Sequence, residues 1–286
     1  MTKIALTADS TVDLSPELYR DNQVRVMPLQ INLGERSLPD DGSSVTPPDI
    51  YRYVEESGSL PFTSAVSIGS YADAFGELTA QGYEVVHINI SSDFSSAYQN
   101  ACIAAEDYPG VYVVDSRNLS TGSGHLVLEA ARMIREGKLS AQEIAEELKR
   151  LARRVDASFV LADLTYLHKG GRCSAVAKLG ANLLKLKPCI QVRDGKMGVA
   201  KKYRGEYKAC VEQYVRDRLS DTASLDPRRI FITHTECSQE VLDLAIQTVK
   251  ECFHFDEVLV TMAGCTVTTH CGKNTLGVLF FRNRDL

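Results

Sequence analysis

The chain has 286 residues and carries 32 Lys and Arg against 37 Asp and Glu, a net charge of −5 that argues against a general nucleic-acid-binding protein. Its hydrophobic fraction of 44% favours a soluble globular protein over a disordered one. No apolar run approaches the roughly 18 residues of a membrane span, and the N-terminus lacks a secretory-signal pattern. Eight scattered cysteines without a CxxC pair favour reduced thiols in a cytoplasmic protein.

In the first half of the chain, apolar β-branched runs alternate with helical patterns. Strands are predicted at residues 3–8, 25–33, 84–90, 111–114 and 157–161. Helices are predicted after Thr46-Pro47, after Ser67 and after Ser140, because each site has an N-cap residue ahead of an amphipathic run. Glu143 completes a capping box with Ser140. This alternation predicts an α/β domain with a mainly parallel sheet over residues 1–160.

The second half has a different pattern, typical of an α+β domain over residues 161–286. Asp194-Gly195 between two apolar runs predicts a β-hairpin. Helices are predicted at residues 175–184, 207–219 and 241–249, and strands at 230–233, 258–262 and 276–281.

Hydroxyl-rich segments follow several predicted strands, where ligands bind in open α/β sheets. The main ones are residues 91–96, which contain Ser95 and Ser96, and Thr63-Ser64 ahead of the helix capped by Ser67. Helix capping is the ordinary role of such hydroxyls, and convergence on an anion is the functional alternative. Asp9 and Asp115 are interpreted as acceptors that fix loops.

Two further motifs are candidates for a site. His270 is expected in a turn containing Gly272 and Asn274, where it either faces a cleft or is a hydrogen-bonded structural imidazole. A zinc site of Cys265, His270 and Cys271 lacks a fourth ligand and standard spacing, so no metal is expected. Residues 169–172 combine two glycines with Arg172, which either clamps an oxyanion or is solvated beside a glycine C-cap.

Six segments in chain order resemble the DegV family, the fatty-acid-binding subunits of bacterial fatty acid kinase. Residues 9–14 (DSTVDL) are similar to the family's D-S-x-x-D-L, and residues 63–67 (TSAVS) to its T-S-Q-P-S. The other four segments are residues 91–101, 114–116, 167–172 (LHKGGR) and 270–272 (HCG). Ala65-Val66, Ser96-Ala97 and Lys273-Asn274 depart from the family pattern.

The resemblance implies a two-domain α/β fold with a long-chain fatty acid, palmitate- or oleate-like, in a cleft or tunnel between the domains. It implies that Thr63, Ser95 and His270 bind the carboxylate, with Arg172, Ser96 and Ser64 near the mouth of the site. The chain would then be a non-catalytic carrier without a cofactor. A separate ATP-dependent kinase subunit would phosphorylate the lipid to an acyl-phosphate. A monomer with transient membrane contact is expected.

Two alternative functions remain open from the sequence. One is a lipid hydrolase or acyltransferase using Ser95, His270 and an Asp, although the chain lacks a G-x-S-x-G elbow. The other is a lipid-sensing regulatory protein.

Overall fold

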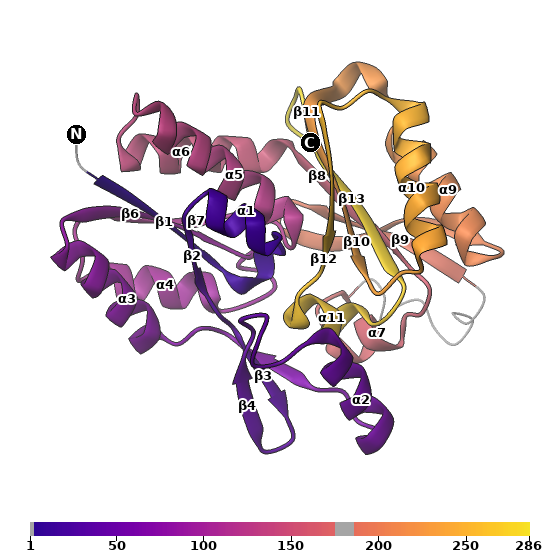
Figure 1. The fold of residues 1–286 in the computed structure, drawn as a ribbon, viewed down its shortest axis with the longest axis horizontal. Helices are drawn as coiled ribbons and strands as arrows, with labels where there is room; N and C mark the ends of the chain where they lie inside the picture. The colour runs from indigo at the N-terminus through magenta and orange to yellow at the C-terminus, as the bar shows by residue number, and fades with distance from the viewer. Residues whose placement is uncertain (1–2, 175–185) are drawn as a thin grey trace.

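A computed structural model describes residues 3–174 and 186–286, which form three β-sheets with helices packed around them (Figure 1). The first sheet is four-stranded and parallel, in the order β2-β1-β6-β7. Its strands are β1 (Lys3–Asp9), β2 (Val24–Met27), β6 (Tyr83–Asn89) and β7 (Val111–Asp115). The helices of this half are α1 (Pro16–Asp21), α3 (Ile68–Ala80), α4 (Ala97–Ala105), α5 (Thr121–Glu136) and α6 (Ala141–Leu151).

Helices cover both faces of the parallel sheet because its strands are apolar on both sides. Val85 of β6 packs in the core cluster that α3 and α4 supply. Val86 and Ile88 point to the opposite face, into the cluster that contains the buried residues of α5 and α6. The predicted parallel α/β layer is therefore present in the first half of the chain.

The second sheet has six strands in the order β10-β9-β8-β13-β11-β12, mostly antiparallel. They are β8 (Val155–Leu161), β9 (Leu186–Arg193), β10 (Lys196–Arg204), β11 (Leu225–Thr235), β12 (Glu257–Met262) and β13 (Thr275–Arg282). Helices α9 (Tyr207–Arg218) and α10 (Gln239–Cys252) pack on one face of this sheet. Helix α5 contacts β8 and β13, so the largest core cluster runs from the first sheet through α5 to the second.

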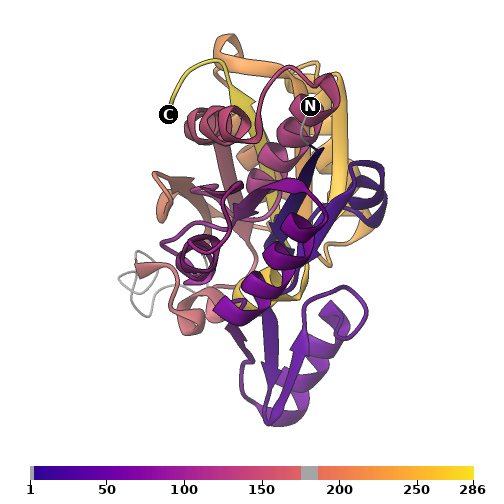
Figure 2. The same ribbon diagram turned by 90° about the vertical axis from the view of Figure 1, so that its left-hand side faces the viewer.

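A small antiparallel sheet extends away from these two layers (Figure 2). Its strands are β3 (Gln30–Leu33), β4 (Arg36–Pro39) and β5 (Phe62–Ser64), and α2 (Pro47–Ser57) lies in the same segment of the chain. Two short helices complete the described structure, α7 (Thr165–Gly170) and α11 (Cys265–Cys271). Single turns of 3-10 helix are η1 (Ser10–Val12), η2 (Ala152–Arg154) and η4 (Thr222–Ser224). Helix α11 contacts α2, α7, β3 and β5, and thus joins the second half of the chain to the small sheet.

The structure corrects three sequence predictions. Residues 25–33 are not one strand, because β2 joins the parallel sheet whereas β3 joins the small sheet. The strand predicted at 157–161 is β8, which pairs with β9 and β13 in the second sheet rather than extending the first. His270 lies in the last turn of α11 and not in an irregular turn. The helix predicted at 175–184 lies outside the described residues.

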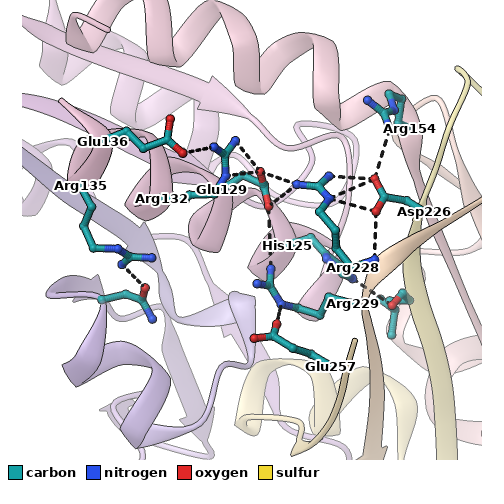
Figure 3. A network of polar contacts seen from close by, with 12 residues as sticks. His125, Glu129, Arg132, Arg135, Glu136, Arg154, Asp226, Arg228, Arg229 and Glu257 are labelled. Carbon is teal, nitrogen blue, oxygen red and sulfur yellow. Dashed lines mark hydrogen bonds and ion pairs between the residues drawn. The ribbon is translucent and has the colours of Figure 1, made fainter. Parts of the chain in front are cut away.

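An ion-pair network connects α5 to the second sheet (Figure 3). The Glu129 carboxylate on α5 is buried and accepts hydrogen bonds from Arg132 on the same helix and from Arg228 on β11, at 3.0–3.1 Å. Arg228 also contacts Asp226 at 2.8 Å, and Asp226 lies 3.4 Å from Arg154. The network ties α5 to β11 of the second sheet.

Candidate functional site

A cavity of about 560 Å³ lies where the loop after β6, the strand β5 and the helix α11 come together. All six residues predicted for the site line this cavity: Thr63, Ser64, Ser95, Ser96, Arg172 and His270. The remaining wall is largely apolar and includes Leu29, Ile90, Leu119, Met197 and Val267. The structure thus brings together residues that are separated by up to about 200 positions in the sequence.

Thr63 and His270 are in direct contact. The Thr63 Oγ1 atom and the His270 Nε2 atom are 3.0 Å apart, within hydrogen-bond distance. Thr63 lies in β5, which pairs with β3 through Ile31, and therefore comes from the small sheet instead of a loop of the parallel sheet. His270 reaches the cavity from the C-terminal end of α11.

Burial keeps the His270 imidazole neutral at physiological pH. Desolvation, with a smaller contribution from the positive charge of Arg172, lowers the pKa of His270 to about 4. Its Nδ1 atom is buried and has no hydrogen-bond partner within residues 3–174 and 186–286. A neutral imidazole can donate from Nε2 to an anion in the cavity, and the approach of a negative charge would favour its protonation.

Gly170 makes room for this imidazole. A Cβ atom placed on Gly170 would lie only 2.6 Å from His270 Nδ1, closer than carbon and nitrogen atoms can approach. The first glycine of the sequence Lys169-Gly170-Gly171-Arg172 is therefore required by close packing against α11. Gly171 ends α7 in the left-handed conformation, with φ 69°.

Ser95 lies one residue before the N-cap of α4, accepts a backbone hydrogen bond there and also lines the cavity. Its Oγ atom accepts a hydrogen bond from the backbone N–H of Ala97, in the first turn of α4, at 3.1 Å. The hydroxyl proton is still available for an acceptor inside the cavity, because the cap uses only a lone pair of the oxygen. The capping and functional interpretations of Ser95 are therefore compatible.

The remaining predicted residues lie around these three. Arg172 donates from Nη1 to the carbonyl oxygen of Gly170 at 2.8 Å, which holds its guanidinium close to the cavity. Ser64 Oγ accepts from the Asn32 side chain at 3.0 Å. Ser96 lies directly before α4 and is exposed at the cavity wall.

Asp9 and Asp115 act as loop acceptors, as interpreted from the sequence. The Asp9 carboxylate accepts from the backbone N–H of Ile90 at 2.7 Å and from Thr11. Asp115 accepts from Ser92 Oγ at 2.7 Å and from the backbone N–H of Arg117. Both carboxylates fix the loop that carries Ser95, and neither lines the cavity.

Sequence reasoning missed the apolar part of the site. A narrow inner cavity of about 30 Å³ shares Leu119, Val267 and Cys271 with the larger one and also includes Phe159 of β8 and Leu279 of β13. These residues look like ordinary core positions, so no sequence signal distinguishes them. The sequence also gave no sign of Asp40, which contacts α11 from the small sheet.

The arrangement is better suited to binding an anion than to nucleophilic catalysis. His270 Nε2 is paired with Thr63 and not with Ser95, and no carboxylate among the described residues hydrogen-bonds to His270. A serine nucleophile needs a base within hydrogen-bond reach, itself oriented by a third group. What the cavity offers is a cluster of hydroxyl and imidazole donors next to an apolar wall.

Within the described residues, no helix combines the length and the apolar composition needed to cross a membrane.

The exposed acidic side chain at the cavity, Asp93, is 3.8 Å from Lys196. This ion pair offsets the charge of Asp93 at the rim.

Comparisons with known proteins match nearly the whole chain. The model of the family named "Uncharacterised protein, DegV family" matches residues 3–283. A DegV domain-containing protein of Halalkalibacterium halodurans is 30% identical over 286 residues, covering 98% of this chain and 99% of the relative.

Two solved structures are similar over almost their full length. A DegV family protein from Thermus thermophilus, whose structure concerns fatty acid binding, has a TM-score of 0.89 and 31% identity, with 98% of this chain and 99% of that one covered. A stearic acid-binding protein from Eubacterium ventriosum has a TM-score of 0.84 and 27% identity, with 99% and 98% covered. With a family model that spans nearly every residue and the same fold in both structures, the chain belongs to the DegV family.

Proposed function

We propose that this protein binds one long-chain fatty acid, with the carboxylate at Thr63, Ser95 and His270 and the acyl chain along the apolar wall of the cavity. The observation that carries the proposal is that these donors line one cavity whose remaining wall is largely apolar, with Thr63 and His270 in direct contact. The similar structures from T. thermophilus and E. ventriosum are of fatty-acid-binding proteins and support it.

The energetics favour such a ligand. Burying an acyl chain gains about 0.8 kcal/mol per methylene, on the order of 10 kcal/mol for a long chain before the costs of association. A carboxylate beside an apolar wall is costly unless several donors receive it. Two hydroxyls and a neutral imidazole provide such donors, and Arg172 adds a positive charge nearby.

The resemblance of the motifs extends the proposal to a role in phosphorylation. The chain would hold the carboxylate so that one oxygen stays accessible to a separate ATP-dependent kinase subunit, and would carry the acyl-phosphate onward. In this role the chain alone is not an enzyme. A cytoplasmic monomer with transient membrane contact fits the same role, and these points remain predictions.

Lipid content and phosphorylation, measured on the same preparations, test the proposal. We expect native mass spectrometry and organic extraction of purified protein to show about one fatty acid per chain. Acyl-phosphate should form only when a fatty acid kinase subunit and ATP are added. Ser95→Ala and His270→Ala should impair phosphorylation more than lipid retention, since each removes one polar contact of about 1.5–3 kcal/mol from the head group and none from the chain.

Ser67→Ala is the matched control. Ser67 caps α3 by accepting from the Ser70 N–H at 3.1 Å, and like Ser95 it accepts a backbone N–H in the first turn of a helix, but it does not line the cavity. Its loss should leave both measurements unchanged. Protein that carries no lipid and takes up no palmitate or oleate would refute fatty acid binding. Wild-type phosphorylation in both site variants would refute the head-group assignment, and rapid cleavage of a chromogenic ester would favour the hydrolase.

A further inference from the structure

Two buried carboxylates, Asp13 and Asp40, hold the N-terminal end of α11, the helix whose other end carries His270. Both are at most 5% exposed. They come from the first half of the chain, more than 220 positions before the helix that they contact. Their side chains do not line the cavity, so they are outside the site described above.

Asp40 makes the larger number of contacts. Its Oδ1 atom accepts from the backbone N–H of Cys265 at 3.0 Å, and its Oδ2 atom accepts from the backbone N–H of Thr266 at 2.9 Å. Oδ2 also accepts from the Thr266 hydroxyl at 2.6 Å and from Ser10 Oγ at 3.3 Å. One carboxylate thus satisfies two of the backbone N–H groups that a helix leaves unpaired at its start, where its dipole favours a negative charge.

Asp13 adds a second contact at the same end. Its Oδ1 atom accepts from the backbone N–H of Gly264 at 2.8 Å, and Ser120 donates to Oδ2. The pKa of Asp13 is raised to about 7, chiefly by burial and to a smaller extent by the negative charges of Asp40 and Asp9, while the hydrogen bonds from Ser120 and Gly264 lower it. Burial also raises the pKa of Asp40, and the donors on Thr266 and Cys265 oppose that rise. Asp40, with the most donors, is the stronger anchor.

The small sheet therefore holds α11 at both of its ends. Asp40 directly follows β4 and binds the first turn, while Thr63 in β5 contacts His270 in the last turn. Helix α11 has seven residues, a length of about 10 Å. Over so short and rigid an element, a shift at the first turn moves the imidazole by a similar amount.

We propose that Asp40 is a positioning residue that sets the place of His270 for carboxylate recognition, through α11. This inference rests on the proposed function. A carboxylate bound by Thr63 and His270 competes with the hydrogen bond between them. The hydrogen bonds between Asp40 and the first turn of α11 do not compete with the ligand, and they add to the packing of α11 on β3 and β5 while the ligand is held. Thr266 donates a hydrogen bond to Asp40 and also lines the cavity, so this residue connects Asp40 directly to the site.

The test compares two ligands of equal chain length, palmitate and 1-hexadecanol, on delipidated protein. Asp40→Asn turns one acceptor into a donor that faces the donors of α11, and is expected to shift the helix. Dissociation constants for both ligands are measured by competition with a fluorescent fatty acid. Wild-type protein should prefer palmitate, and both His270→Ala and Asp40→Asn should reduce this preference about tenfold, the equivalent of one charge-assisted hydrogen bond. The double variant should show no further reduction.

Asp41→Asn is the matched control, because Asp41 is the next residue and, within residues 3–174 and 186–286, hydrogen-bonds only to Ser43 and Ser44 of its own loop. The Asp41→Asn variant should prefer palmitate over 1-hexadecanol to the same extent as the wild type. Where Asp40→Asn does not fold, Asp40→Ser replaces it, since serine keeps one acceptor and opposes no donor; the same loss of preference is expected.

Three results would overturn the inference, and they are distinguishable. If the Asp40 variant weakens both ligands equally, Asp40 has only a structural role. If it leaves the preference at the wild-type value while His270→Ala lowers it, Asp40 does not position His270, and the proposed function stands. If the wild type itself does not distinguish palmitate from 1-hexadecanol, the head-group site fails and the inference fails with it.

Discussion

At the scale of single residues, the chemistry of the cavity depends on a histidine that is kept uncharged. His270 is half-buried between Gly170 and Thr63, and its pKa of about 4 leaves it neutral at physiological pH. A neutral imidazole costs less to bury than an imidazolium ion, and it can still serve as a donor to a bound anion. Because residue 170 has no side chain, the His270 imidazole can lie directly against its backbone.

The low pKa of His270 leads to a prediction of how ligand binding responds to pH. A carboxylate bound at Nε2 favours the imidazolium form, so palmitate should raise the pKa of His270 above its value in delipidated protein. By linkage, a ligand that prefers the protonated form gains affinity as the pH falls from the pKa of the complex toward about 4. Titration of the imidazole signals by NMR in delipidated and palmitate-loaded protein measures this. An unchanged pKa would mean that the carboxylate does not reach His270.

At the scale of secondary-structure elements, α5 is the helix that packs against both large sheets. It packs on the parallel sheet and contacts β8 and β13, and its Glu129 is surrounded by Arg132, Arg228 and Arg229. Removing one member of a buried ion pair is costly because the remaining charges lose their partner. The three arginines can each reach other partners or solvent, which limits that cost.

We therefore expect Glu129→Ala to lower the free energy of unfolding by about 1–3 kcal/mol. Glu136→Ala is the matched control, because Glu136 binds the same Arg132 from the same helix, but its side chain is 41% exposed against 5% for Glu129. The control should change stability by less than about 0.5 kcal/mol. Urea denaturation of both variants measures the difference, and equal effects would show that the network does not join α5 to the second sheet.

At the scale of the whole molecule, the candidate ligand site lies where all three sheets meet. The cavity wall includes Ile90 after β6, Thr63 in β5 and Met197 in β10, one residue from each sheet or its loops. A ligand in this place touches every layer of the fold, and should stabilise them together.

Removing the lipid should therefore destabilise the entire protein. A ligand present at about 100 times its dissociation constant adds roughly 2.7 kcal/mol to the unfolding free energy. For a chain of this size the melting temperature should fall by about 5–10 °C on delipidation. Calorimetry of stripped and palmitate-reloaded protein checks this, with acetate as the control that has a carboxylate but no chain. Equal melting temperatures with and without palmitate would contradict the proposed ligand.

The sequence by itself determined the features that arise from a few adjacent residues. Ser67 caps α3, and Ser140 with Glu143 forms the capping box of α6, as predicted. Asp194 and Gly195 both have positive φ in the turn between β9 and β10, as the hairpin signal requires. In each case the signal is local, because the residue satisfies backbone groups or dihedral angles of its immediate neighbours.

Only the tertiary structure decided which strands share a sheet and which distant residues meet. The run at 25–33 reads as one strand, yet β2 and β3 pair in different sheets, since register and partner are set by long-range packing. The family motifs named Thr63, Ser95 and His270, but these residues line one cavity only because α11 packs on the small sheet, to which Asp40 also ties its first turn. Asp40 caps a helix that begins 225 residues later, and a hydrogen bond over that separation leaves no pattern in the sequence around it.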